Sequence, residues 1–185
     1  MNSRKIVIVL AEGFEETEAV ATADVLKRLG FQVSMAGLNS ERVRSSAGLT
    51  VLADLLFRDA DLAQADALVL PGGLPGASHL RSSPEVMDAL RFMTEHGKVV
   101  AAICAAPIAI ERAGLTKGKK VTGYPGSNKD IPGLEYTGNR VERDGLLVTA
   151  KGPGVSFEFA AAIALALGVP QDRIDAVLNG MFVLR

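Results

Sequence analysis

Runs of apolar residues alternate along the chain with segments whose apolar positions recur at helical spacing. Residues 6–10, 67–70 and 99–103 are continuous apolar runs, which predict strands buried on both faces of a sheet. Residues 32–36 predict another strand. Helical patterns cover residues 15–29, 84–96, 107–113, 155–167 and 172–179. This strand–helix alternation predicts an α/β three-layer sandwich with a mostly parallel central sheet.

Three weaker patterns complete the expected architecture. Residues 43–53 alternate weakly and contain Gly48, which indicates a short hairpin or an excursion at the sheet edge. Residues 121–122 predict a short strand. Asp144-Gly145 is a strong hairpin signal between residues 140–142 and 146–149. With 185 residues and no linker-like tract, we expect one domain over residues 1–185.

Composition excludes several classes of protein. The formal charge is −1 and the pI is about 6.1, so no overall field favours nucleic acid or anionic lipid. No apolar run is long enough to predict a membrane span, and the five apolar residues after Lys5 are too few for a signal-peptide core. One cysteine allows no internal disulfide, so we expect a cytoplasmic protein. Two histidines and one cysteine leave little material for a metal site, and we expect no cofactor.

The single cysteine lies where a buried strand meets a helix. Cys104 follows residues 99–103, and the small residues Ala102 and Ala106 flank it as a nucleophile on a sharp turn requires. The N–H groups at the helix start favour a thiolate, and they would stabilise a negative oxygen on a bound carbonyl. The alternative is a buried cysteine that serves as a small apolar side chain. The position at the strand's carboxyl end favours a reactive site.

A glutamate follows the first strand and is directed toward the core. Glu18 lies within about 20° of Val25 and Leu29 on the helical wheel, whereas Glu15 flanks the apolar stripe and Glu16 points away from it. Burial should raise the pKa of the Glu18 carboxyl, which could then donate a proton to sulfur or to a substrate. Glu18 would reach Cys104 if the first and fourth strands were adjacent, which is one of the topologies that the sequence allows.

Two glycine-rich loops would frame such a site. Pro71-Gly72-Gly73 follows a buried strand, and its backbone could approach a ligand closely and expose N–H donors. An ordinary turn is the alternative, and the spacing does not match a nucleotide-binding loop. Lys151-Gly152-Pro153-Gly154 precedes an apolar helix and could close the other side of the same mouth.

Together these segments resemble the ThiJ/PfpI superfamily, and within it the YajL branch that includes parkinsonism-associated protein deglycase. The resembling segments span residues 11–18, 70–73, 101–107 and 151–159. The resemblance implies a flavodoxin-like fold, a homodimer, and Cys104 as the oxidation-prone nucleophile. It also implies that Glu18 hydrogen-bonds the sulfur and that the N–H groups of Gly73 and Ala105 face it. We expect Glu15, Gly72, Tyr124 and Pro153 to line the substrate pocket.

One residue departs from the family pattern. Members of this branch commonly carry histidine where this chain has Tyr124, and a phenol cannot act as a base near neutral pH. His96 is expected to cap its helix and His79 to lie in a surface loop, so neither supplies the missing imidazole. The absence of a Cys–His dyad counts against a protease or a glutamine hydrolase.

Three functions remain open. The resemblance implies a cysteine-dependent enzyme that converts methylglyoxal or glyoxal to a hydroxy acid, or that releases early glycation adducts from amines. The second is a redox-sensing stress protein or chaperone, in which Cys104 is oxidised to sulfinate because no second cysteine resolves the oxidation. The third is a binding domain with an inert cysteine. With any of these three functions, we expect no membrane partner and no specific nucleic-acid partner.

Overall fold

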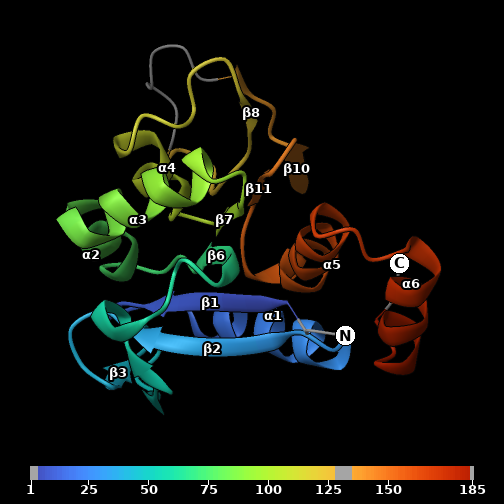
Figure 1. Ribbon diagram of the computed structural model, residues 1–185, viewed down its shortest axis with the longest axis horizontal. Helices are drawn as coiled ribbons and strands as arrows, with labels where there is room; N and C mark the ends of the chain where they lie inside the picture. The colour runs from blue at the N-terminus through green and yellow to red at the C-terminus, as the bar shows by residue number, and fades with distance from the viewer. Residues whose placement is uncertain (1–3, 128–134, 184–185) are drawn as a thin grey trace.

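A seven-stranded sheet forms the centre of the protein in the computed structural model, which describes residues 4–127 and 135–183 (Figure 1). Its order is β10-β11-β7-β6-β1-β2-β5, and all neighbours are parallel except the β10–β11 hairpin. This is the flavodoxin-like order expected for a doubly wound sheet. The strands are β1 (Lys5–Leu10), β2 (Gln32–Gly37), β5 (Leu55–Leu56), β6 (Ala65–Leu70), β7 (Val99–Ile103), β10 (Val141–Asp144) and β11 (Leu147–Ala150).

Helices cover both faces of the sheet and enclose two apolar cores. Along β1, Ile6 and Ile8 enter one core while Val7 and Val9 enter the other, because successive side chains of a strand point to opposite faces. Figure 1 shows α2, α3 and α4 gathered away from α5 and α6. The first core is closed by α1 (Glu16–Arg28), α5 (Ser156–Ala166) and α6 (Gln171–Gly180), and the second by α2 (Gly76–Ser82), α3 (Pro84–Glu95) and α4 (Pro107–Arg112). The three-layer sandwich is therefore confirmed.

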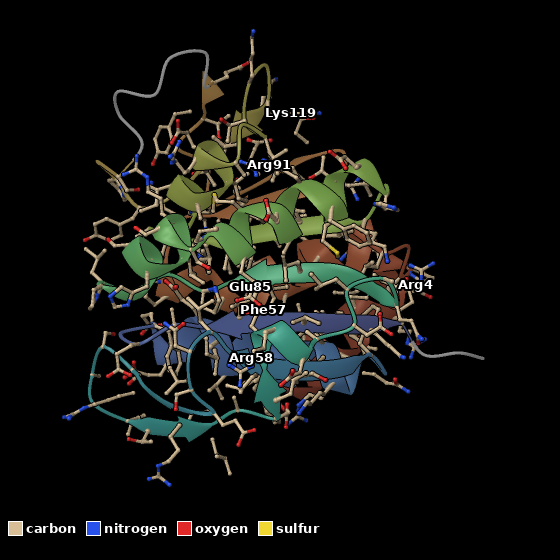
Figure 2. The ribbon with its side chains drawn as sticks, turned by 60° about the vertical axis from the view of Figure 1, so that its left-hand side comes forward. Arg4, Phe57, Arg58, Glu85, Arg91 and Lys119 are labelled. Carbon is tan, nitrogen blue, oxygen red and sulfur yellow. The ribbon has the colours of Figure 1, made fainter. Side chains whose placement is uncertain are left out.

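Most charged side chains lie on the outside of these layers, and Glu18 of α1 is a buried exception. Among the residues labelled in Figure 2, Arg4, Arg58 and Arg91 are exposed, whereas Phe57 is buried. Within residues 4–127 and 135–183, no helix has the length and apolar character that crossing a membrane requires.

Several short elements lie outside the main strands and large helices, and some of them were not predicted from the sequence. The segment 43–53 forms the expected hairpin, whereas the seven residues of α2 and the two of β5 were not predicted because both are too short to show a period. His79 consequently lies on a helix and not in a loop, although it is exposed as expected. The smaller elements are β3 (Arg42–Arg44), β4 (Thr50–Leu52), β8 (Lys120–Val121), β9 (Glu135–Tyr136) and the 3₁₀ turns η1 (Phe57–Asp59) and η2 (Pro153–Val155).

Two further predictions are corrected by the strand pairing. Asp144 pairs with Leu147, so the hairpin loop is Gly145-Leu146, with Gly145 in the left-handed region at φ 65°. The first and fourth predicted strands, β1 and β7, are not adjacent because β6 lies between them. The carboxyl ends of β1, β6, β7 and β11 nevertheless meet at one edge of the sheet, where the strand order reverses beside β1 and a doubly wound sheet binds its ligands.

Candidate functional site

Cys104 is held in a backbone conformation that side chains rarely adopt. It follows β7 directly and has φ 64°, in the left-handed region that disfavours residues other than glycine. Its N–H donates to the Ala150 carbonyl at 2.9 Å, and its own carbonyl accepts from the Tyr124 N–H at 2.6 Å. These two bonds fix the peptide groups on both sides of the cysteine, so the strained turn stays in place.

Glu18 lies in the first turn of α1, at the same end of the sheet as Cys104. It is almost completely buried, with 1% of its surface exposed. Its Oε2 accepts a hydrogen bond of 2.7 Å from the Gly72 N–H. Its Oε1 is buried and has no hydrogen-bond partner among the described residues. The carboxyl therefore has one oxygen anchored to the protein and one buried oxygen without a hydrogen bond, which disfavours the charged form.

Gly72 separates Glu18 from Cys104 and allows them to interact across it. A Cβ placed on Gly72 would lie 2.7 Å from the Cys104 Cβ and 2.8 Å from Glu18 Oε2, both far inside contact distance. The missing side chain explains how residues that follow β1 and β7 meet although β6 lies between those strands. Adjacent first and fourth strands, the arrangement that was expected to bring Glu18 to Cys104, are therefore not what joins the two residues.

Backbone N–H groups face the sulfur from two sides. Those of Gly73 and Ala105 hydrogen-bond the Cys104 side chain, and both lower the pKa of its thiol. Gly73 has φ 87° and packs so closely on residues 13–15 that an added Cβ would lie 2.5 Å from the Glu15 nitrogen. Gly73 and Ala105 are thus the two backbone groups that favour a negative charge on the sulfur.

The titration of the pair differs in part from the expectation. Burial raises the pKa of the Glu18 carboxyl to about 7, as expected, although bonds from Gly72 and Cys104 oppose the shift. Burial also raises the pKa of the Cys104 thiol to about 12, and the charge of Glu18 adds to this effect. The expectation of a thiol held as thiolate is therefore wrong, because desolvation and the carboxylate outweigh the two N–H groups. Between these two values the pair carries one negative charge, with one proton left between carboxylate and sulfur.

Glu15 and Tyr124 lie next to the pair formed by Glu18 and Cys104. Glu15 caps α1 by accepting a 2.7 Å bond from the Glu18 N–H, and its charge contributes to raising the Glu18 pKa. The Tyr124 side chain is 54% exposed and lies against the backbone of Gly152. The phenol therefore occupies the rim of the site beside the second glycine-rich loop.

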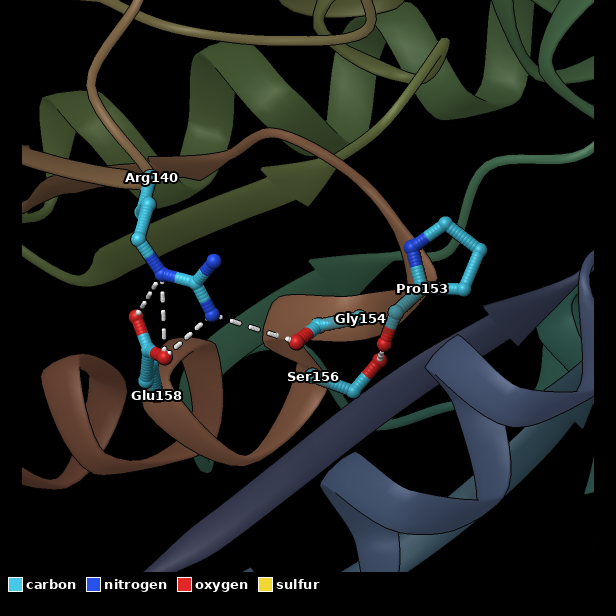
Figure 3. A network of polar contacts seen from close by, with 5 residues as sticks. All are labelled: Arg140, Pro153, Gly154, Ser156 and Glu158. Carbon is cyan, nitrogen blue, oxygen red and sulfur yellow. Dashed lines mark hydrogen bonds and ion pairs between the residues drawn. The ribbon is translucent and has the colours of Figure 1, made fainter. Parts of the chain in front are cut away.

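The loop that carries Pro153 is fixed by polar contacts (Figure 3). Ser156 Oγ donates to the Pro153 carbonyl at 2.8 Å. Arg140 donates to the Gly154 carbonyl at 3.3 Å and pairs with Glu158 at 2.6 Å. The loop begins right after Ala150, the partner of the Cys104 N–H, so Pro153 lies at the site's edge of the sheet.

Two buried threonines support the site and were not predicted. Thr149 of β11 accepts a 2.9 Å bond at Oγ1 from the Thr122 N–H, and Thr122 Oγ1 donates to the Asn139 carbonyl at 2.7 Å. Nothing in the sequence distinguishes these threonines from ordinary strand residues. Only the pairing of β11 with β7 reveals their proximity to Cys104.

Neither histidine takes part in the site. His96 caps α3 as expected, with Nδ1 2.8 Å from the Phe92 carbonyl oxygen, and His79 Nδ1 lies 3.0 Å from the Glu12 carbonyl oxygen. Within the described part of the chain, no group of three or more histidine, cysteine or acidic side chains could hold a metal ion.

The chain is similar to known proteins in both sequence and fold. The DJ-1/PfpI family model matches residues 4–166. Drosophila melanogaster protein dj-1beta is 37% identical over 98% of this chain and 98% of its own length. Its crystal structure superposes with a TM-score of 0.93, covering 99% of this chain and 100% of that chain at 36% identity. A Caenorhabditis elegans protein named glutathione-independent glyoxalase DJR-1.2 is 32% identical over 90% of this chain and 89% of its own length.

Proposed function

The chain belongs to the DJ-1/PfpI family, and on that basis we propose that it is a cofactor-independent enzyme that converts small α-oxoaldehydes to hydroxy acids. One observation carries this proposal: the buried carboxyl of Glu18, with a pKa of about 7, lies beside the single cysteine. A group with that pKa takes up and releases protons readily near neutral pH, as a general acid–base catalyst must. The name of the Caenorhabditis elegans relative supports the same class of substrate.

The first step forms a bond between sulfur and the aldehyde carbon of methylglyoxal. Because burial raises the pKa of the Cys104 thiol to about 12, the sulfur needs a base when it attacks. The Glu18 carboxylate accepts the thiol proton and then passes it to the aldehyde oxygen, which gives a hemithioacetal. The N–H groups of Gly73 and Ala105 are the donors available to the negative oxygen that forms in between.

The second step moves a hydrogen within the adduct. Glu18 removes the proton from the former aldehyde carbon, and a proton is returned to the neighbouring carbonyl carbon through an enediolate. One carbon is thereby oxidised and the other reduced, so no external oxidant is required. The product is a lactoyl thioester of Cys104, which water hydrolyses to lactate and the free thiol.

Lactate formation tests this proposal directly. The purified protein is incubated with methylglyoxal without glutathione, and lactate is measured by proton NMR. We expect Cys104→Ser to abolish lactate formation, and Glu18→Gln to lower kcat by about 10² to 10⁴, as loss of a general acid–base does. A Cys104→Ser variant that forms lactate at the wild-type rate would exclude the mechanism.

The same chemistry extends to early adducts between methylglyoxal and amines. Tyr124 is more than half exposed, so the rim of the site is open on that side. We propose that an adduct on an amino group can be processed, with the amine leaving before the thioester forms. Incubation with a preformed adduct of N-acetyl-lysine should release lactate faster than the adduct loses methylglyoxal spontaneously. Equal rates would restrict the enzyme to free aldehydes.

Sulfinate formation at Cys104 is a second candidate function, favoured by the same donors. The N–H groups of Gly73 and Ala105 and a protonated Glu18 can each hydrogen-bond an oxygen on the sulfur. The chain has no second cysteine to form a disulfide. Mass spectrometry after mild peroxide treatment should find two added oxygens on Cys104 and fewer in Glu18→Gln. Oxidation restricted to methionines would remove this candidate.

We also propose that the chain forms a homodimer, as the family resemblance implies. Val20 of α1 and Leu49 and Leu52 of the β3–β4 hairpin are 48%, 59% and 69% exposed, so each leaves an apolar side chain open to solvent. The hairpin is joined to the start of α1 by the 2.8 Å bond from the Ser46 N–H to the Phe14 carbonyl. We propose that a second copy covers these three exposed apolar side chains.

A further inference from the structure

One backbone hydrogen bond holds Cys104 on each side. The Ala150 carbonyl accepts the Cys104 N–H directly, at 2.9 Å. On the other side, the Cys104 carbonyl depends on the Tyr124 N–H, which belongs to the segment 122–124 that follows β8. The position of that segment therefore determines whether the second bond forms.

Thr149 of β11 holds the segment 122–124 through a side-chain hydrogen bond. Its Oγ1 accepts the Thr122 N–H at 2.9 Å, and both threonines are essentially inaccessible to water, at 1% and 0% exposed. Two further bonds fix the same segment, from Thr122 Oγ1 to the Asn139 carbonyl at 2.7 Å and from Tyr136 Oη to the Gly123 carbonyl at 2.8 Å. Since Thr122 is buried, its N–H has no access to water if Thr149 loses its hydroxyl.

We propose that Thr149 is a positioning residue for Cys104, acting through the segment 122–124. Its hydroxyl holds that segment where the Tyr124 N–H meets the Cys104 carbonyl, and this bond keeps the cysteine at its left-handed φ of 64°. If the bond is lost, Cys104 can relax toward an ordinary conformation, and the sulfur then leaves Glu18 and the two N–H donors. The inference rests on the proposed role of Cys104 as the reacting group, but not on the identity of the substrate.

Replacement of Thr149 by valine separates shape from hydrogen bonding. Valine nearly matches threonine in volume and carries a methyl group in place of the hydroxyl, so the Thr122 N–H is left buried without a partner. A buried unpaired donor is unfavourable enough that the segment is expected to move in order to satisfy it. Thr149→Ser keeps the hydroxyl and removes only the methyl group, which makes it the matched rescue variant.

The rate of Cys104 alkylation by iodoacetamide, measured from pH 6 to 10, tests the proposal without any aldehyde substrate. At pH 8 we expect Thr149→Val to react about tenfold more slowly than the wild type, because small displacements of reacting groups are costly. The rise in rate near pH 7 should also shrink, since the sulfur is no longer beside Glu18. Thr149→Ser should restore most of the rate. Ile174→Val, in the core contributed by α6, controls for a loss of stability alone and should react as the wild type does.

Three results would overturn the proposal. They are a Thr149→Val protein that reacts at the wild-type rate with the wild-type pH profile, one that reacts faster, and a Thr149→Ser protein as slow as the valine variant. If Thr149→Val does not fold, Tyr136→Phe removes another anchor of the same segment and should slow alkylation about threefold, and an unchanged rate would then refute the role. Failure of the wild type to convert methylglyoxal would refute the proposed function and leave the alkylation result to decide this inference.

Discussion

The Gly72 N–H donates a 2.7 Å hydrogen bond to Oε2 of Glu18, and this bond joins the loop after β6 to the first helix of the chain. The same glycine lies against the Cβ of Cys104 on its other side. The contact between carboxyl and thiol thus depends on a residue that takes no part in proton transfer.

A methyl group on Gly72 should disable the site. In Gly72→Ala the added carbon would meet Cys104 Cβ, Glu18 Oε2 and the Ile103 carbonyl oxygen at 2.7–2.9 Å. We expect a loss of about 1 to 3 kcal/mol in the free energy of unfolding and a fall in lactate formation beyond what that loss explains. Gly180→Ala is the control, because among the described residues nothing beyond its chain neighbours and the backbone of its own helix lies within 4 Å of the added Cβ. Urea denaturation and the lactate assay together check both expectations, and a fully active Gly72→Ala would contradict this account of the site.

The reactivity of Cys104 should follow the ionisation of Glu18. Because the pKa of Glu18 is raised to about 7, the carboxylate that accepts the thiol proton becomes available as the pH rises through 7. Alkylation by iodoacetamide should therefore increase with a midpoint near pH 7 in the wild type. In Glu18→Gln that step should disappear, and the rate should stay low until the thiol itself ionises at higher pH. A step near pH 7 that persists in the glutamine variant would assign the titration to another group.

Glu18 should make the protein less stable as the pH rises. Burial on folding raises its pKa from the ordinary value of 4.5 to about 7, so the folded state binds the proton more tightly than the unfolded state. The stabilisation is complete below about pH 4.5 and is lost as the pH rises through 7. Between pH 5 and pH 8 the wild type should lose roughly 2 to 3 kcal/mol of unfolding free energy relative to Glu18→Gln. Parallel urea titrations of both proteins measure this difference, and a constant difference would show that Glu18 ionises normally.

A charge in place of Val20 on α1 should separate the proposed dimer. Val20 is 48% exposed, so lysine fits there without disturbing the core of a single chain. We expect Val20→Lys to sediment as a monomer at concentrations where the wild type is a dimer. Leu146→Lys is the matched control, because Leu146 is 41% exposed in the β10–β11 loop, at the opposite edge of the sheet from Cys104. Sedimentation velocity distinguishes the variants, and an unchanged Val20→Lys dimer would place the interface elsewhere.

The sequence predicted most of the fold because its strands are continuous apolar runs. Residues 6–10 and 99–103 carry no polar side chain, so only a sheet covered on both faces could bury them. The inward direction of Glu18 also followed from helical spacing alone. In contrast, α2 was missed because its seven residues are too short to display a helical period.

The remaining features of the site depend on contacts between distant segments. The thiol pKa was predicted in the wrong direction because sequence shows the helix start after Cys104 but not the burial of the sulfur beside a carboxyl. The strand order was open for the same reason. Thr149 and Thr122 carry no sequence signal at all, since their role exists only where β11 lies next to β7.

The left-handed turn at Cys104 has a consequence for how the protein is made. Its two stabilising bonds come from Tyr124 and Ala150, which a ribosome adds well after Cys104 itself. A growing chain that ends before Tyr124 therefore holds Cys104 without either of these bonds, although Glu18, Gly72 and Gly73 have already been made. The chemistry emerges only when synthesis has passed β11, so a truncated or half-made product cannot carry it.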